Sequence, residues 1–151
     1  MKKAKKWMQE GRIGEVVEVI ATFGCPIETF GNSVNNTNHW GNNLSSGGGS
    51  LSQFGCYTVN LAQFVYNQLP EKILGVTETL PREDGADLNS SFIFSYEGAS
   101  KHAMLSSSWT ARTQSVARIS GTKGEILIGN PFFAPYHASL YIHKEHIRRL
   151  I

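Results

Sequence analysis

Apolar and polar residues alternate with a period of two over much of the chain, and this alternation predicts β-strands. The clearest run is 88–96, where large apolar side chains alternate with serine and asparagine. Near the start of the chain, a run rich in β-branched residues at 16–23 has the same character. Predicted strands lie at 16–23, 73–80, 88–96, 101–109, 115–120 and 125–128, the last two forming a hairpin around the turn 121–124.

Two segments instead repeat their apolar residues at helical spacing. Residues 2–11 predict a short amphipathic helix that Gly11 ends, and residues 49–67 predict the main helix, closed by Asn67 and Pro70. The predicted core face of the main helix consists of Leu51, Phe54, Thr58, Leu61, Ala62 and Val65.

Consecutive strands joined by short turns favour an antiparallel sheet, and one long helix covers one face of it. The predicted fold class is therefore α+β, an open-faced antiparallel sheet with one main covering helix, formed by a single domain of residues 1–151. The opposite sheet face carries Ile93 between Ser91 and Ser95. Because no predicted element covers this semi-apolar face, we expect a second copy, as in a homodimer or larger assembly, or another domain to pack on it.

A long segment at 26–46 is rich in asparagine, glycine and serine and shows no periodicity. Loops of this length are usually functional or disordered, and Trp40 within it favours function. The segment runs into Gly47, Gly48 and Gly49 at the start of the main helix. Glycines there allow a ligand or another strand to approach the backbone, and free N–H groups attract polar ligand atoms.

The main helix also carries a polar stripe that is separate from its core face. Gln53, Tyr57 and Asn60 lie at positions i, i+4 and i+7 and share one side of the helix. Beside the glycines, this stripe is a candidate pocket wall. A solvent-facing stripe with a half-buried tyrosine is the alternative, and spacing alone leaves both open.

Composition excludes several classes of function. A net charge of +2 gives no basis for nucleic-acid binding, and the basic residues near the two ends predict solvated surfaces. No apolar run is long enough to span a membrane and no signal peptide is evident, which predicts a cytoplasmic protein. The two cysteines and five histidines form no metal-binding motif, so no metal is expected. The dinucleotide fingerprint G-x-G-x-x-G is also absent from the sequence.

Three segments, taken in order, resemble a known family: MKKAKKWMQEGRIGEVVEV, GGGSLSQFGCYTVNLAQFVY and ISGTKGEILIGNPFF. They resemble the C-terminal domain of the glucose–fructose oxidoreductase / inositol dehydrogenase family, and Tyr57 makes the dimeric dihydrodiol dehydrogenase branch the nearest. The resemblance runs from about Lys2 to Phe133. It implies a two-domain, NAD(P)-dependent oxidoreductase whose N-terminal Rossmann domain, absent from this chain, holds NAD or NADP.

The resemblance also implies roles for individual residues. Tyr57 occupies the family's acid/base position near the substrate hydroxyl, where a phenol can relay a proton as hydride leaves the carbinol carbon. Gln53 stands where the family usually has aspartate, and glutamine can donate a hydrogen bond but cannot take a proton. The segment before the glycines lacks the basic residue that often follows its tryptophan. The implied pocket residues are Gln53, Asn60, His39 and Trp40 for the substrate, and Gly47, Gly48 and Gly49 for the nicotinamide end of the cofactor.

We therefore expect the substrate-binding and dimerisation part of an NAD(P)-dependent oxidoreductase that acts on a CH–OH group of a sugar, polyol or diol. Without a cofactor domain, the chain alone is expected to be inactive. The alternative is a non-catalytic assembly or binding module that keeps the family's sheet. Residues 143–151 are expected to form a last amphipathic segment.

Overall fold

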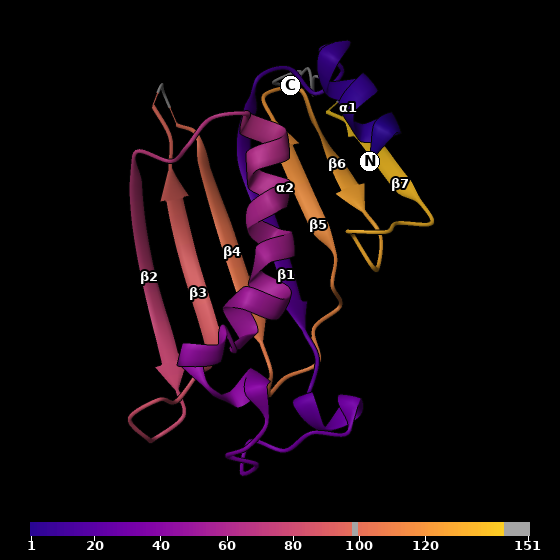
Figure 1. Cartoon of the computed structure of the whole chain (residues 1–151). Helices are drawn as coiled ribbons and strands as arrows, with labels where there is room; N and C mark the ends of the chain where they lie inside the picture. Colours follow the sequence, from indigo (N-terminus) through magenta and orange to yellow (C-terminus); the bar gives the residue numbers. More distant parts are fainter. Residues whose placement is uncertain (98–99, 144–151) are drawn as a thin grey trace, which may run out of the picture.

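The computed structural model describes residues 1–97 and 100–143, which form a seven-stranded sheet and two α-helices joined by short helical turns. The elements are α1 (Lys2–Gln9), β1 (Val16–Gly24), the 3₁₀ turns η1 (Ile27–Phe30), η2 (Trp40–Asn42) and η3 (Leu44–Ser46), the π-helical turn η4 (Leu51–Gly55), α2 (Cys56–Tyr66), β2 (Lys72–Thr79), β3 (Asp87–Ser95), β4 (His102–Ser108), β5 (Ala117–Gly121), β6 (Gly124–Ile128) and β7 (Ala138–Ile142). The predicted α+β class is confirmed (Figure 1).

The sheet is mixed, so the prediction of a wholly antiparallel sheet was wrong at one pair. The strand order is β2-β3-β4-β1-β5-β6-β7, and β1 runs parallel to β4, with Val19 opposite Ala103. The parallel pair arises because the chain leaves β1 and returns to its side only after crossing over through α2, β2 and β3. The other neighbouring pairs are antiparallel. Strand β7, which pairs with β6, was not predicted.

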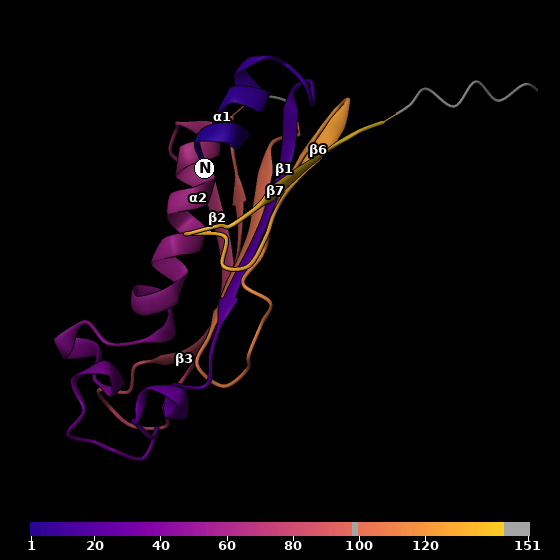
Figure 2. The ribbon, with the colours of Figure 1, turned by 90° about the vertical axis from the view of Figure 1, so that its right-hand side faces the viewer.

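Both α-helices lie on the same side of the sheet, and Figure 2 shows this side against the bare opposite face. Strand β1 follows the expected alternation: Val19 and Ala21 are fully buried toward the helices, whereas Glu18 and Ile20 face the open side. The predicted core face of the main helix is also confirmed, with Leu61 and Ala62 buried against the sheet. Burial of this face holds the helix, since helices of this length depend on tertiary packing.

The open face is apolar in part, as predicted for Ile93 and its serine neighbours. Ile93 is 47% exposed, and Leu74 and Val76 of β2 extend the same surface. Two shallow hollows of about 490 and 570 Å³ lie along it, one over β2, β3 and β4 and the other over β5, β6 and β7. Ile20 of the central strand borders both hollows, so the apolar surface is continuous across the sheet.

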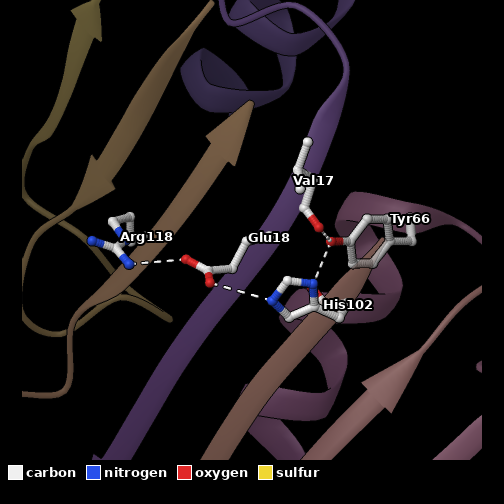
Figure 3. A network of polar contacts seen from close by, with 5 residues as sticks. All are labelled: Val17, Glu18, Tyr66, His102 and Arg118. Atoms are coloured by element: carbon white, nitrogen blue, oxygen red, sulfur yellow. Dashed lines mark hydrogen bonds and ion pairs between the residues drawn. The ribbon is translucent and has the colours of Figure 1, made fainter. Parts of the chain in front are cut away.

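A small ionic network lies on the open face and joins β1, β4 and β5 (Figure 3). Glu18 lies between two basic side chains and accepts a hydrogen bond from Arg118 at 2.9 Å, with His102 Nε2 at 3.3 Å from its other oxygen. On the helix side, the Tyr66 hydroxyl lies 2.7 Å from the His102 carbonyl and 3.1 Å from that of Val17. The end of α2 is therefore fastened to β1 and β4, two of the three strands that carry the network.

The remaining predictions have mixed outcomes. No helix within residues 1–97 and 100–143 is long and apolar enough to cross a membrane. The long polar segment before the main helix is ordered by three 3₁₀ turns. Apart from His143, the predicted last amphipathic segment lies outside the described residues.

Candidate functional site

The main helix begins with a π-helical turn, which the sequence pattern did not predict. In η4 the Cys56 N–H donates to the Leu51 carbonyl, a spacing of five residues, before α2 continues with ordinary helical geometry. Such single π turns are frequent at functional sites. Gln53 lies within this turn and Tyr57 lies one residue beyond the start of α2.

The glycines before the turn have neighbours that explain the missing side chains at two positions. A side chain on Gly48 would overlap the Gly41 carbonyl oxygen, and one on Gly49 would overlap a carboxylate oxygen of Asp87. Gly49 also has a φ of +116°, which L residues rarely adopt. Gly47 differs, because nothing lies within 4 Å of the position that its side chain would take.

The N–H groups of the three glycines are already used inside the protein. Gly47 donates to the Leu44 carbonyl at 2.9 Å, Gly48 to Asn43 at 3.0 Å and Gly49 to Gly41 at 2.9 Å. The expectation of free N–H groups that attract a ligand is therefore wrong. The role of the glycines in approaching a cofactor stays a prediction, and it rests on the open space at Gly47.

Asparagine side chains hold the loop before the glycines in shape. Asn42 is fully buried, and its Nδ2 donates to the carbonyls of Ser33 and Asn36, both at 2.8 Å. His39 Nδ1 accepts a hydrogen bond from the Gly41 N–H at 3.1 Å and lies 2.9 Å from Asn32 Nδ2. With Nδ1 acting as acceptor, the neutral imidazole carries its proton on Nε2 and can donate from there.

The connection between β2 and β3 fastens this loop from the other side. Arg82 donates to the Asn42 carbonyl at 2.7 Å, and Asp84 accepts hydrogen bonds from the Ser45 N–H and hydroxyl at 2.8 and 2.5 Å. The two hydrogen bonds from Ser45, followed by the nearby Arg82, lower the pKa of Asp84. Sequence reasoning missed both residues, although the charged run PREDGAD in a turn was the available signal.

Tyr57 is surrounded by aromatic rings. Its ring centroid lies 4.7 Å from that of Phe133 and 5.6 Å from that of Phe23, and these two phenylalanines stack on each other at 4.9 Å. The side chain is 42% exposed, and no hydrogen-bond partner of its hydroxyl is found in the part of the chain that the structure describes. Phe133 was not predicted to belong to the site, although it ends the segment NPFF that carries the family resemblance.

The structure brings the predicted residues together in two neighbouring groups. Tyr57 and Asn60 line a hollow of about 210 Å³ with Phe133. Gln53 and His39 flank Gly41, since a side chain there would meet Gln53 Nε2 at 2.9 Å and His39 Nδ1 at 3.1 Å.

Trp40 lies beside the second group, with its ring 5.8 Å from that of His39, and it is 54% exposed. Amide and imidazole groups that can bind hydroxyls therefore lie next to aromatic faces that can pack on a ring. Among the described residues, no three histidine, cysteine, aspartate or glutamate side chains gather as metal ligands would.

Comparison with known proteins identifies the family. Residues 1–127 match the family described as the GFO/IDH/MocA C-terminal domain. The chain belongs to this family. It is 33% identical over 129 residues to trans-1,2-dihydrobenzene-1,2-diol dehydrogenase of Xenopus laevis, which covers 85% of this chain and 36% of that protein. The human protein of the same name is 33% identical over 100 residues, or 66% of this chain and 28% of that protein.

The chain thus spans about a third of the length of these relatives, 36% and 28% respectively. Solved structures share its fold. An aldose-aldose oxidoreductase from Caulobacter crescentus, complexed with glycerol, superposes with a TM-score of 0.74 at 24% identity, covering 92% of this chain and 40% of that one. An inositol dehydrogenase homolog from Azotobacter vinelandii, complexed with NAD⁺, gives 0.76 at 15% identity, covering 95% and 38%.

Proposed function

We propose that this chain supplies the substrate side of an NAD(P)-dependent oxidoreductase that acts on a CH–OH group of a sugar, polyol or diol. The observation that carries the proposal is Tyr57, whose phenol lies half-exposed at a hollow that also contains Asn60 and Phe133. The relatives support the substrate class, since their names describe a diol dehydrogenase, an aldose-aldose oxidoreductase and an inositol dehydrogenase homolog.

Oxidation of an alcohol requires a hydride acceptor and a group that takes the hydroxyl proton. NAD or NADP, held mainly by a domain outside this chain, accepts the hydride when it is bound. The Tyr57 hydroxyl accepts the proton of the substrate hydroxyl while its own phenolic proton passes to solvent, which reaches this half-exposed side chain. Because the N–H groups at Gly47, Gly48 and Gly49 are engaged, the triplet can contribute space for the cofactor at Gly47 but no free donors.

The other predicted residues orient the substrate. Gln53 and Asn60 offer amides, and His39 offers its Nε2–H, so that several hydroxyls of one substrate can be bound at once. The exposed ring of Trp40 and that of Phe133 pack on the carbon face of a ring-shaped substrate. Gln53 in place of aspartate leaves Tyr57 as the proton relay on this part of the helix.

The test is Tyr57→Phe in the enzyme that joins this chain to a cofactor domain. We expect turnover to fall on the order of a hundredfold or more, because an acid/base group is lost. The free energy of unfolding should change little, since the hydroxyl has no partner among the described residues. Tyr136→Phe is the matched control, because Tyr136 is 92% exposed. Activity that survives Tyr57→Phe within about twofold would contradict the role, given the size expected of such a group.

A second variant tests Gln53, which stands where the family usually has aspartate. If Gln53→Asp raises turnover in the joined enzyme, the position contacts the substrate as proposed. If the unmutated enzyme is inert and the aspartate adds nothing, the enzymatic proposal fails and a non-catalytic assembly module takes its place.

We also propose that the open sheet face packs against a second copy of the chain. Leu74, Val76 and Ile93 give it an apolar surface, and Glu18 pairs with Arg118 within one copy. Burial of the face in a dimer therefore leaves neither charge unpaired, which avoids the main cost of burying ions. Sedimentation at micromolar concentration should show a dimer or larger species, and a stable monomer would contradict the proposal.

A further inference from the structure

Asp87, at the start of β3, connects the sheet to the start of the main helix. Only 9% of the residue is exposed, and its carboxylate points at the turn that leads into η4. One carboxylate oxygen, Oδ2, accepts three hydrogen bonds: from the Ser50 hydroxyl at 2.6 Å, the Leu51 N–H at 2.9 Å and the Ser90 hydroxyl at 2.8 Å. A carboxylate that accepts several short hydrogen bonds holds its donors more firmly than a neutral group does.

The surroundings of Asp87 are polar and almost completely buried. Ser50 and Ser90 are at most 1% exposed, and Ser107 of β4, at 3% exposed, lies 3.1 Å from the Ser50 hydroxyl. Within residues 1–97 and 100–143, no basic side chain forms an ion pair with Asp87. Its charge is stabilised by hydroxyl and N–H donors at the start of a helix, where the dipole favours a negative group.

These contacts fix the first residue of the π turn. Leu51 donates its N–H to Asp87, and its carbonyl accepts the Cys56 N–H that defines the turn. Gln53 lies inside this turn, and Tyr57 lies two residues after its end. A change in the position of Leu51 therefore rotates both side chains relative to Phe133, which lies in the connection between β6 and β7.

The glycine before the turn fits the same arrangement. A side chain on Gly49 would overlap the second oxygen of Asp87, so the carboxylate and the helix start approach more closely than any other residue there would allow. The close contact between turn and strand therefore depends on both residues, Gly49 before the turn and the buried Asp87 on β3.

We propose that Asp87 is a positioning residue, which sets the π turn and thereby orients Tyr57 and Gln53. Its consequence for turnover rests on the function proposed above, whereas its effect on the position of Tyr57 is a property of this chain. The position can therefore be measured without any enzyme activity.

The experiment is NMR of the full chain labelled with tyrosine carrying ¹³C at Cζ. The chain contains five tyrosines, and Tyr57→Phe assigns the signal of Tyr57. Because the Phe133 ring lies 4.7 Å away, its ring current makes the Tyr57 signal sensitive to small rotations. We expect Asp87→Ala to shift this signal by more than its linewidth. Asp87→Asn, which keeps an acceptor of the same shape, should restore most of the original position.

Two internal controls separate positioning from general destabilisation. Tyr66 lies at the other end of α2, and its hydroxyl contacts two backbone carbonyls, so its signal should not move. Asp84→Asn removes a carboxylate from the neighbouring connection, where it binds Ser45, and should leave the Tyr57 signal in place.

An unchanged Tyr57 signal in Asp87→Ala, with lowered stability, would overturn the proposal and make Asp87 a residue of stability alone. If Asp87→Ala does not fold, Ser50→Ala removes one of the three donors and should shift Tyr57 in a milder way. No shift in that variant would overturn the proposal equally.

In the joined enzyme, Asp87→Ala should lower kcat on the order of tenfold or more, since small misplacements of reacting groups are costly. Substrate KM should change less than kcat. If the unmutated enzyme proves inert, the proposed function fails while the NMR result stands. If the enzyme is active and Tyr57 does not move, the positioning role fails alone.

Discussion

Gly49→Ala should destabilise the chain for a reason that has nothing to do with a cofactor. Gly49 has a φ of +116°, and an added Cβ would overlap the Asp87 carboxylate. The backbone strain alone costs about 1–3 kcal/mol. Moving the carboxylate away weakens hydrogen bonds to a charged group, each of which contributes about 1.5–3 kcal/mol. Strain and one lost hydrogen bond together predict a loss of about 2.5–6 kcal/mol.

Gly47→Ala is the matched control within the same triplet. Gly47 also has a positive φ, of +73°, but nothing lies within 4 Å of the added Cβ. Only backbone strain remains, at about 1–2 kcal/mol. In urea denaturation of the full chain, Gly49→Ala should therefore be less stable than Gly47→Ala by at least about 1.5 kcal/mol, the contribution of one such hydrogen bond.

Equal losses in the two variants would refute this reasoning, because the overlap with Asp87 would then cost nothing. A double-mutant cycle sharpens the test. Asp87→Ala removes the atoms that the new side chain meets, so Gly49→Ala should cost less in that background. If the glycines served only to admit a cofactor, Gly49→Ala would destabilise the chain no more than Gly47→Ala, and its main effect would be on cofactor-dependent activity.

Three further predictions concern the surroundings of the site and the open face. Burial raises the pKa of Tyr66 well above its ordinary value near 10, so the folded state keeps a proton that the unfolded state loses; the free energy of unfolding should fall as pH rises above about 10, and Tyr66→Phe should flatten that fall in alkaline urea titrations. Phe133→Ala removes the ring that packs on Tyr57 and should raise the KM of ring-shaped substrates more than it lowers kcat in steady-state assays, whereas an unchanged KM would place the ring outside the substrate site. Glu18→Gln removes the charge that Arg118 binds; the monomer should lose no more than about 1 kcal/mol in denaturation, while sedimentation should show weaker association.

Strands in which apolar and polar residues alternate clearly could be predicted from the sequence. The parallel pairing of β1 with β4 could not. Alternation along one strand is a local property, so 16–23 and 88–96 were placed almost correctly. Which strands become neighbours depends on the route of the chain over the sheet, and β1 meets β4 only after the helix and two strands have been added. Strand β7 is short and half-exposed, and its sequence ASLYI offers little contrast between its faces.

The candidate site divides in the same way. Tyr57 and Asn60 lie three residues apart on a helix, so spacing alone brought them together, and the structure places both at one hollow. Asp87 and Phe133 come from other elements, and contacts between residues so distant in sequence leave no periodic signal. The π turn was also hidden, because one additional residue in a turn hardly changes the apolar pattern of the whole helix.

The arrangement of β1 separates the two proposed roles of the chain. Glu18 and Ile20 face the open side, while Phe23 packs on Tyr57 on the helix side, so association and chemistry use opposite faces of one strand. A substitution at Glu18 has no direct contact with the Tyr57 hollow and can affect it only through the backbone or through the second copy. Full activity in a monomeric Glu18→Gln enzyme would therefore mean that association stabilises the fold without completing the site. If activity is lost while the Tyr57 signal is unchanged, the second copy is required for activity in a way that does not depend on the position of Tyr57.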